Sequence, residues 1–164
     1  MPQKFGLYED LTILENLRLY ADLKNQPYDF DTLLEFTGLK PFLNRLAGAL
    51  SGGMKQKLGL ACALMGTPEF LVLDEPSVGV DPISRRDLMK MVKDLISPQT
   101  TVLWSTAYLD EAHSFDTAIV LDKGKVIYNG SPHSLAATAP EFEDKVIELM
   151  GGYKKEESLI AKNY

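Results

Sequence analysis

A serine followed by two glycines, Ser51-Gly52-Gly53, precedes a stretch that is expected to be helical. The first N–H groups of a helix have no partners within the helix, and the helix dipole adds partial positive charge at this end. Two glycines let the backbone approach a ligand closely and the serine hydroxyl adds a donor, so the turn suits a phosphate. Lys55 and Lys57 add positive charge nearby. Taken alone, the same residues also fit a capped helix with a glycine turn that binds nothing.

Two adjacent carboxylates, Asp74 and Glu75, follow the apolar run at residues 70–73. Such a run indicates a strand buried on both faces, and the acids then emerge at its C-terminal end, where open α/β sheets bind ligands. Successive side chains of a strand face opposite sides, so the two acids can take different tasks. One can hold Mg²⁺ through water, because a hard cation prefers oxygen ligands, and the other can polarise an attacking water. An acidic strand end that meets a loop is the alternative interpretation.

The elements that would position these residues fall into two parts. Residues 1–68 are predicted to be helical, with helices at about 13–24, from Asp31 to Gly38, and from Ser51 to Gly66. Strands follow at 70–73, 100–105 and 118–121, and the last turns into a hairpin with 125–128. Helices are expected at about 81–96 and 108–115, with further starts at 131 and 139, and a polar end from 154 that frays. Alternating strands and helices predict an α/β fold with a parallel sheet and a lobe boundary near residue 68.

The composition excludes some functions. The 164-residue chain carries a net charge of -6 and a pI of about 4.9, which argues against a nucleic-acid-binding surface. Cys62 is the only cysteine, so no intrachain disulfide can form, and we expect it to be buried. No apolar run approaches the roughly 20 residues that span a bilayer, and residues 1–10 are not expected to form a signal peptide. A role at a membrane would therefore require other chains to hold this one there.

Several motifs in order resemble the ATPase domain of ATP-binding-cassette (ABC) transporters. Residues 50–57 resemble the signature motif, 70–76 the Walker B motif and 76–82 the D-loop; 103–106 match the strand that normally carries the switch histidine, and Pro2-Gln3 with 7–16 resembles the Q-loop. The similarity is greatest to drug-efflux, ABC-2-type ATPases, and among them to the first ATPase half of a tandem protein. It implies an α/β fold, with a partial P-loop NTPase core containing a parallel sheet and an α-helical subdomain. It also implies a Q-loop and helical subdomain at 1–68, part of the RecA-like core at 69–152 and a polar tail at 153–164.

The resemblance implies roles for the matching residues. Glu75 would act as general base or water orienter, Asp74 would support Mg²⁺, and Gln3 would sense both Mg²⁺ and the attacking water. Ser51, Gly52 and Gly53 would contact the γ-phosphate of an ATP held mainly by the opposite subunit. Two further cofactor-binding residues are implied, Gln56 and, at the dimer seam, Asp81. The implied cofactors are ATP and Mg²⁺.

Three departures from the family pattern bear on activity. Met54 replaces glutamine in the signature motif, which should spare the phosphate contacts. Ala107 stands at the switch-histidine position and cannot donate a hydrogen bond; His113 is expected to be a surface helix residue that does not substitute. No Gly-x₄-Gly-Lys-Ser/Thr run is present, so the chain is expected to be roughly the C-terminal two-thirds of an ABC ATPase domain, cut at the Q-loop. Alone, it is expected to be inactive and, through unpaired strand edges, to self-associate.

Three functions follow from the resemblance. The first is the ATP-binding subunit of a multidrug-efflux ABC exporter, at the cytoplasmic face of the membrane, that drives a transmembrane permease. Its second ABC domain would make a homo- or heterodimer, possibly in tandem in the same polypeptide. The second function is a degenerate, non-hydrolysing half that donates its signature motif to a partner's site; Ala107 favours it and Glu75 argues against it. The third is a soluble ABC protein of translation or DNA repair, which the acidic charge and residues 7–16 argue against, and no nucleic-acid partner is expected.

Overall fold

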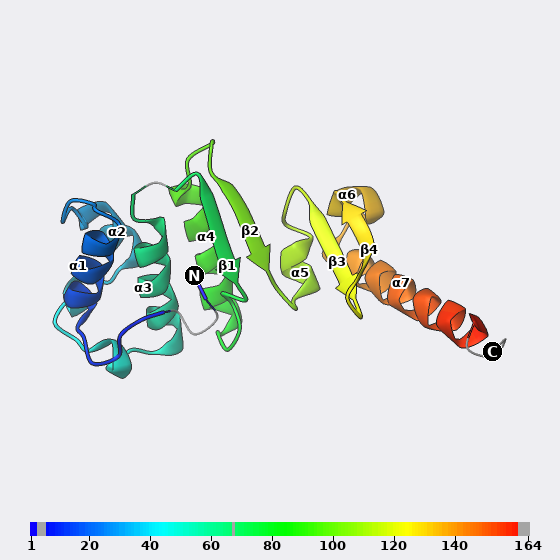
Figure 1. Cartoon of the computed structure of the whole chain (residues 1–164), viewed down its shortest axis with the longest axis horizontal. Helices are drawn as coiled ribbons and strands as arrows, with labels where there is room; N and C mark the ends of the chain where they lie inside the picture. The colour runs from blue at the N-terminus through cyan, green and yellow to red at the C-terminus, as the bar shows by residue number, and fades with distance from the viewer. Residues whose placement is uncertain (3–5, 67, 161–164) are drawn as a thin grey trace. The chain divides into compact units, whose positions relative to one another are not determined.

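The chain forms two compact units, Met1–Ser105 and Thr106–Tyr164 (Figure 1). The computed structural model describes residues 1–2, 6–66 and 68–160, with side chains described up to residue 151. The units divide after β2, whereas the domain boundaries expected from the sequence, near 68 and 152, stay a prediction.

The first part of unit 1 is helical, as predicted. Helix α1 (Ile13–Leu23) begins with a capping box, in which Glu15 N–H donates to Thr12 Oγ1 at 3.2 Å and Thr12 N–H donates to Glu15 Oε2 at 2.8 Å. Helix α2 (Asp31–Thr37) ends at Gly38, whose φ of 67° is left-handed. Asp31 is the first residue of α2 and not its cap, since the N-cap position falls on Phe30; the Asp31 carboxylate pairs with Lys40 Nζ at 2.9 Å. The short 3₁₀ helices η1 (Lys40–Phe42) and η2 (Ala47–Ala49) lead to α3 (Gly52–Leu64).

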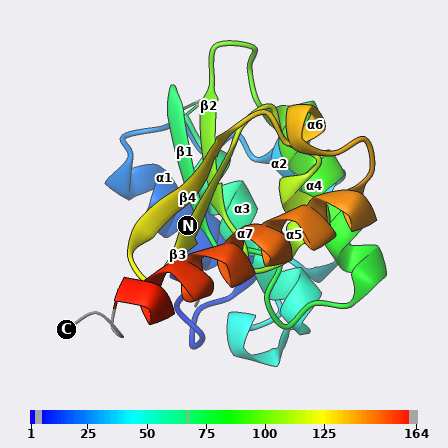
Figure 2. The same cartoon turned by 90° about the vertical axis from the view of Figure 1, so that its right-hand side faces the viewer.

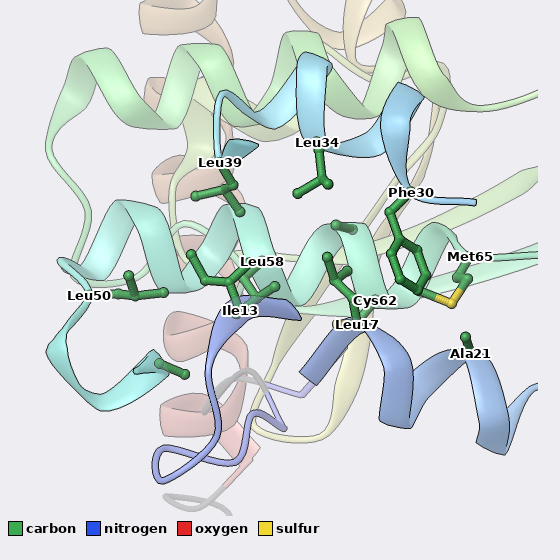
Figure 3. Packing of buried hydrophobic residues seen from close by; sticks show 12 residues of the cluster. Ile13, Leu17, Ala21, Phe30, Leu34, Leu39, Leu50, Leu58, Cys62 and Met65 are labelled. Atoms are coloured by element: carbon green, nitrogen blue, oxygen red, sulfur yellow. The ribbon is translucent and has the colours of Figure 1, made fainter. Parts of the chain in front are cut away.

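A hydrophobic core lies between α1, α2 and α3 (Figure 3). Its labelled residues are Ile13, Leu17, Ala21, Phe30, Leu34, Leu39, Leu50, Leu58, Cys62 and Met65. Cys62 is buried as predicted, and burial raises the pKa of its thiol to about 12. At the far end of this core Lys24 Nζ donates to the carbonyl oxygens of Cys62 (2.9 Å), Ala63 (2.7 Å) and Met65 (3.2 Å). A helix leaves its last carbonyls unpaired, so Lys24 joins the end of α1 to the end of α3.

The second part of unit 1 contains a parallel strand pair. Strands β1 (Phe70–Asp74) and β2 (Thr101–Ser105) are connected by α4 (Pro82–Leu95), and their register places Asp74 opposite Ser105. Leu71 and Leu73 face the core that α3 and α4 supply. The prediction that this strand is buried on both faces is wrong: Phe70 and Val72 are 57% and 43% exposed. Within the described residues, α3 and α4 pack on one face of the pair only.

In its described part, residues 106–160, unit 2 contains an antiparallel hairpin and three helices (Figure 2). The hairpin joins β3 (Ala118–Asp122) to β4 (Lys125–Gly130) through a tight turn with positive φ at Lys123 and Gly124, as the sequence predicts. The helices are α5 (Leu109–Ala112), α6 (Pro132–Leu135) and α7 (Ala139–Ile160). Ala118 of the hairpin packs with Phe142 and Val146 of α7. The backbone of α7 is helical to Ile160, so the predicted fraying from residue 154 is not observed there.

We expect the substitution Lys24→Met to destabilise unit 1 by about 1 kcal/mol, because methionine keeps the apolar stem but leaves the last carbonyls of α3 without the ammonium donor. Urea unfolding followed by circular dichroism measures the change. Lys90→Met is the matched control, since Lys90 lies on the exposed surface of α4. Equal unfolding midpoints for the two variants would show that Lys24 does not hold the two helix ends together.

Candidate functional site

The candidate anion site is the first turn of α3. Ser51 is the N-cap, as predicted, and its Oγ accepts a hydrogen bond from Met54 N–H at 3.3 Å. No acidic residue lies in the first turn of α3. The helix therefore presents its N-terminal N–H groups and dipole without a carboxylate of its own to compensate them.

Both glycines of this turn lie close to other backbone and side-chain atoms. A Cβ placed on Gly53 would lie 3.3 Å from Ser84 Oγ in α4, and one on Gly52 would lie 3.7 Å from the carbonyl oxygen of Gly79. The first of these distances is tighter than ordinary contact, whereas the second is ordinary van der Waals contact. Gly53 therefore has a packing role between α3 and α4, whether or not it also faces a ligand.

The two lysines of the turn are not equivalent. Lys55 Nζ lies 2.7 Å from Glu9 Oε1, in an ion pair that lowers the pKa of the Glu9 carboxyl through the hydrogen bond from Lys55. Glu9 thus already provides an anionic partner for Lys55. The positive character available at the start of α3 comes from the backbone more than from this side chain.

The candidate catalytic carboxylates emerge at the C-terminal end of β1, as predicted. Asp74 is the last residue of the strand, and Glu75 begins the turn with a left-handed φ of 44°, which is unusual for a residue other than glycine. Asp74 Oδ1 accepts a hydrogen bond from Ser105 Oγ at 2.8 Å, and Glu75 N–H donates to the same Oγ at 2.8 Å. The strand end therefore holds the two acids in one hydrogen-bonded arrangement with β2.

Gln56 has a different environment from the one implied by its predicted role. Its side chain is 1% exposed, and its Nε2 donates to the carbonyl oxygen of Pro76, in the turn after Glu75. Nucleotide binding by Gln56 stays a prediction. What the geometry establishes is a buried link between the second turn of α3 and the segment that follows the two carboxylates.

Asp81 caps α4, as the sequence predicts. Its Oδ1 accepts hydrogen bonds from Ile83 N–H at 3.1 Å and Ser84 N–H at 3.0 Å. The side-chain hydrogen bond from Ser84, followed by these backbone bonds, lowers the pKa of Asp81 below its ordinary value. Capping therefore stabilises α4 at neutral pH and is lost as the pH falls through this lowered pKa. A place for Asp81 at a dimer seam stays a prediction.

Three further sequence predictions concern residues away from these contacts. Gln3 lies outside the described residues. Ala107 is exposed in unit 2, with no functional side chain to offer a ligand. His113 is half-buried at the C-cap of α5: its ring lies edge-on to His133, with centroids 4.5 Å apart, and 5.8 Å from Phe142.

Two sets of contacts at this site were not predicted from the sequence: those of Ser105 with the Asp74 carboxylate and the Glu75 backbone N–H, and that of Gln56 with the Pro76 carbonyl oxygen. The available signal for Ser105 was a polar residue that ends an apolar strand. For Gln56 it was a glutamine within a helix that is otherwise buried.

Among the described residues, no group of three or more histidine, cysteine, aspartate or glutamate side chains is placed to hold a metal ion. None of the helices in the described part of the chain is both long and apolar enough to cross a membrane.

Comparison with known proteins gives one family. The model of the ABC transporter family matches residues 1–78. A probable multidrug ABC transporter ATP-binding protein, YbhF of Escherichia coli (strain K12), is 57% identical over 143 residues, covering 84% of this chain and 25% of that protein. Nod factor export ATP-binding protein I of Rhizobium etli is 35% identical over 167 residues, covering 98% of this chain and 52% of that protein. A solved structure described as the ATP-binding subunit of an ABC transporter superposes with a TM-score of 0.76 at 27% identity, covering 91% of this chain and 66% of that one.

The chain belongs to the ABC transporter ATP-binding family, with the α/β fold of its P-loop NTPase core. It spans between a quarter and about half of the length of the two curated relatives described above.

We expect Gln56→Leu to lower the free energy of unfolding by about 1–3 kcal/mol, because leucine fills similar space but leaves the buried carbonyl of Pro76 without its amide donor. Chemical denaturation of the variant measures this loss. Gln99→Leu, at an exposed turn before β2, is the matched control and should change stability little. A Gln56→Leu protein as stable as the control would contradict the link between α3 and the turn after β1.

Proposed function

We propose that this chain acts as an ATP-binding domain of an ABC exporter, in which ATP binding and hydrolysis at a dimer interface drive efflux through a transmembrane permease. The observation that carries the proposal is the end of β1, where Asp74 and Glu75 emerge together on a shared hydrogen-bonding partner. The relatives named for multidrug and Nod factor export support the exporter class. The more similar of these two relatives is named for multidrug transport, which suggests drugs as the class of exported substrate.

The residues at the end of β1 suit Mg²⁺. The ion usually keeps several waters and takes one or two carboxylates together with phosphate oxygens, so the absence of a larger acidic cluster among the described residues is compatible with it. Asp74 would hold Mg²⁺, directly or through water, with Gln3 as the further ligand expected from the family. When bound, Mg²⁺ supplies positive charge that neutralises the phosphate oxygens. Glu75 would orient the attacking water, or accept its proton, at a side-chain oxygen.

The first turn of α3 would serve a second site. Ser51, Gly52 and Gly53 would contact the γ-phosphate of an ATP held mainly by a second ABC domain. Gln56 and, at the dimer seam, Asp81 would be further residues of this nucleotide-binding site. That second domain would be a second copy of this one or a different ABC domain, in a separate chain or in tandem in the same polypeptide. The permease would keep the assembly at the cytoplasmic face of the membrane. Residues 1–164 contain no Gly-x₄-Gly-Lys-Ser/Thr run, so by themselves they would bind ATP weakly and not hydrolyse it.

The test of this function is ATP hydrolysis by the full polypeptide that carries these residues, assembled with its membrane partner. Glu75→Gln should lower kcat by about a hundredfold or more, because the amide cannot accept the proton of the attacking water. Glu69→Gln makes the same change at the exposed residue directly before β1, remote from the C-terminal end of the strand, and should leave kcat unchanged. Equal rates for the two variants would overturn the assignment of Glu75.

A second candidate function is a degenerate, non-hydrolysing half that donates its signature motif to a partner's ATP site. Ala107 favours it, because a methyl group cannot donate a hydrogen bond to a phosphate. The only histidine nearby in the sequence, His113, is packed against His133 and Phe142 within unit 2.

If the missing histidine limits this site, Ala107→His should raise ATP turnover by roughly tenfold or more, since one preorganised donor to a developing charge has at least that effect. Steady-state hydrolysis by the full polypeptide, with Ala137→His as a control at another exposed alanine of unit 2, measures the gain. Unchanged turnover in the Ala107→His protein would argue against the degenerate-site interpretation.

A further inference from the structure

Ser105 contacts both candidate acidic residues, Asp74 through its carboxylate and Glu75 through its backbone N–H. It ends β2 directly opposite Asp74 in the strand register. Its hydroxyl donates to Asp74 Oδ1 at 2.8 Å and accepts from Glu75 N–H at 2.8 Å. From these contacts we propose that Ser105 is a positioning residue for ATP hydrolysis, one that fixes the Asp74 carboxylate and the direction of the Glu75 side chain. This inference rests on the function proposed above.

The chemistry of a hydroxyl explains why this one can hold both residues. A serine hydroxyl has one proton to donate and lone pairs to accept. Here the proton is directed to Asp74, and a lone pair receives the amide proton of Glu75. Each bond polarises the next in such a chain, so the two bonds reinforce one another toward the carboxylate. Alanine would remove both bonds at once, whereas threonine would retain the hydroxyl.

The backbone at Glu75 makes the second contact consequential. A left-handed φ of 44° costs a non-glycine residue free energy, and it persists only where surrounding contacts hold it. Ser105 supplies two of these contacts: its hydroxyl and, at 3.2 Å, its carbonyl oxygen both accept from Glu75 N–H. A third contact comes from Val78, whose N–H donates to the Glu75 carbonyl oxygen at 3.2 Å. A change in this backbone conformation would redirect the side chain that is proposed to orient water.

A purely structural role would give a different result from a positioning role. Ser105 lies at an exposed strand end, where water can replace a lost hydrogen bond, and its backbone bond to Glu75 survives any side-chain substitution. The unfolding midpoint should therefore hardly respond to the loss of the hydroxyl. Catalysis should respond strongly, since displacement of a reacting group by about 1 Å can cost a hundredfold in rate.

The experiment compares Ser105→Ala, Ser105→Thr and the control Thr101→Ala in the full polypeptide assembled with its membrane partner. Thr101 is an exposed hydroxyl residue on the same strand, paired with Phe70 at the end remote from the carboxylates. For Ser105→Ala we expect kcat to fall between about tenfold and a hundredfold, with the KM for ATP within about twofold of the parent. The Mg²⁺ concentration for half-maximal rate should rise, and Ser105→Thr should restore both quantities.

Hydrogen exchange gives a readout that does not depend on hydrolysis. The peptide that contains Glu75 should exchange faster in Ser105→Ala than in either Ser105→Thr or Thr101→Ala. Faster exchange together with the selective loss of kcat supports the proposal. A kcat for Ser105→Ala equal to that of Thr101→Ala overturns it, as does a loss that threonine does not restore. Failure of the proposed function is recognised separately, because the parent and its Glu75→Gln variant would then hydrolyse ATP at the same rate.

Discussion

The burial of helix α3 on nearly every side is the constraint on which unit 1 depends. Leu58 and Cys62 enter the core shared with α1 and α2, while Leu60 and Leu64 enter the core shared with α4 and the strand pair. Because close-packed cores on two sides share one helix, α3 cannot rotate or slide without opening one of them. The direction in which the Ser51 turn points is therefore set by apolar packing and does not require a ligand.

The same packing determines how the carboxylates are presented. Leu71 and Leu73 must face α3 and α4, and side chains alternate along a strand, so Asp74 is placed on the opposite, exposed face. In β2 the exposed face includes Leu103 and Ser105. A slip of one residue in either strand would expose its apolar set, so burial fixes the register that pairs Asp74 with Ser105. A hydrophobic constraint on one face thus sets a polar contact on the other.

The parts of the fold that the sequence predicts are those with local signals. The capping box at Thr12, the stop at Gly38 and the hairpin turn at Lys123 each depend on residues a few positions apart, and all are present. The contacts that were not predicted join residues distant in sequence. Gln56 reaches a carbonyl 20 positions away, and Ser105 reaches a carboxylate 31 positions away. Such pairs depend on register and helix packing, which periodicity does not specify. The exposure of Phe70 and Val72 escaped prediction for the same reason, because an apolar strand does not show which of its faces a helix covers.

The adjacent starts of α3 and α4 show how a packing motif and a binding motif can coincide. Gly53 approaches Ser84 closely, so two helix N-termini, each with partial positive charge, lie next to one another. Asp81 compensates that of α4 by accepting two of its N–H groups. The start of α3 has a serine hydroxyl and no acid in its first turn. A glycine at 53 is thus explained by packing alone, whereas the missing carboxylate is not. Packing therefore does not explain why α4 has an acidic cap and α3 has none. An anionic group of a nucleotide would supply the negative charge that the start of α3 lacks.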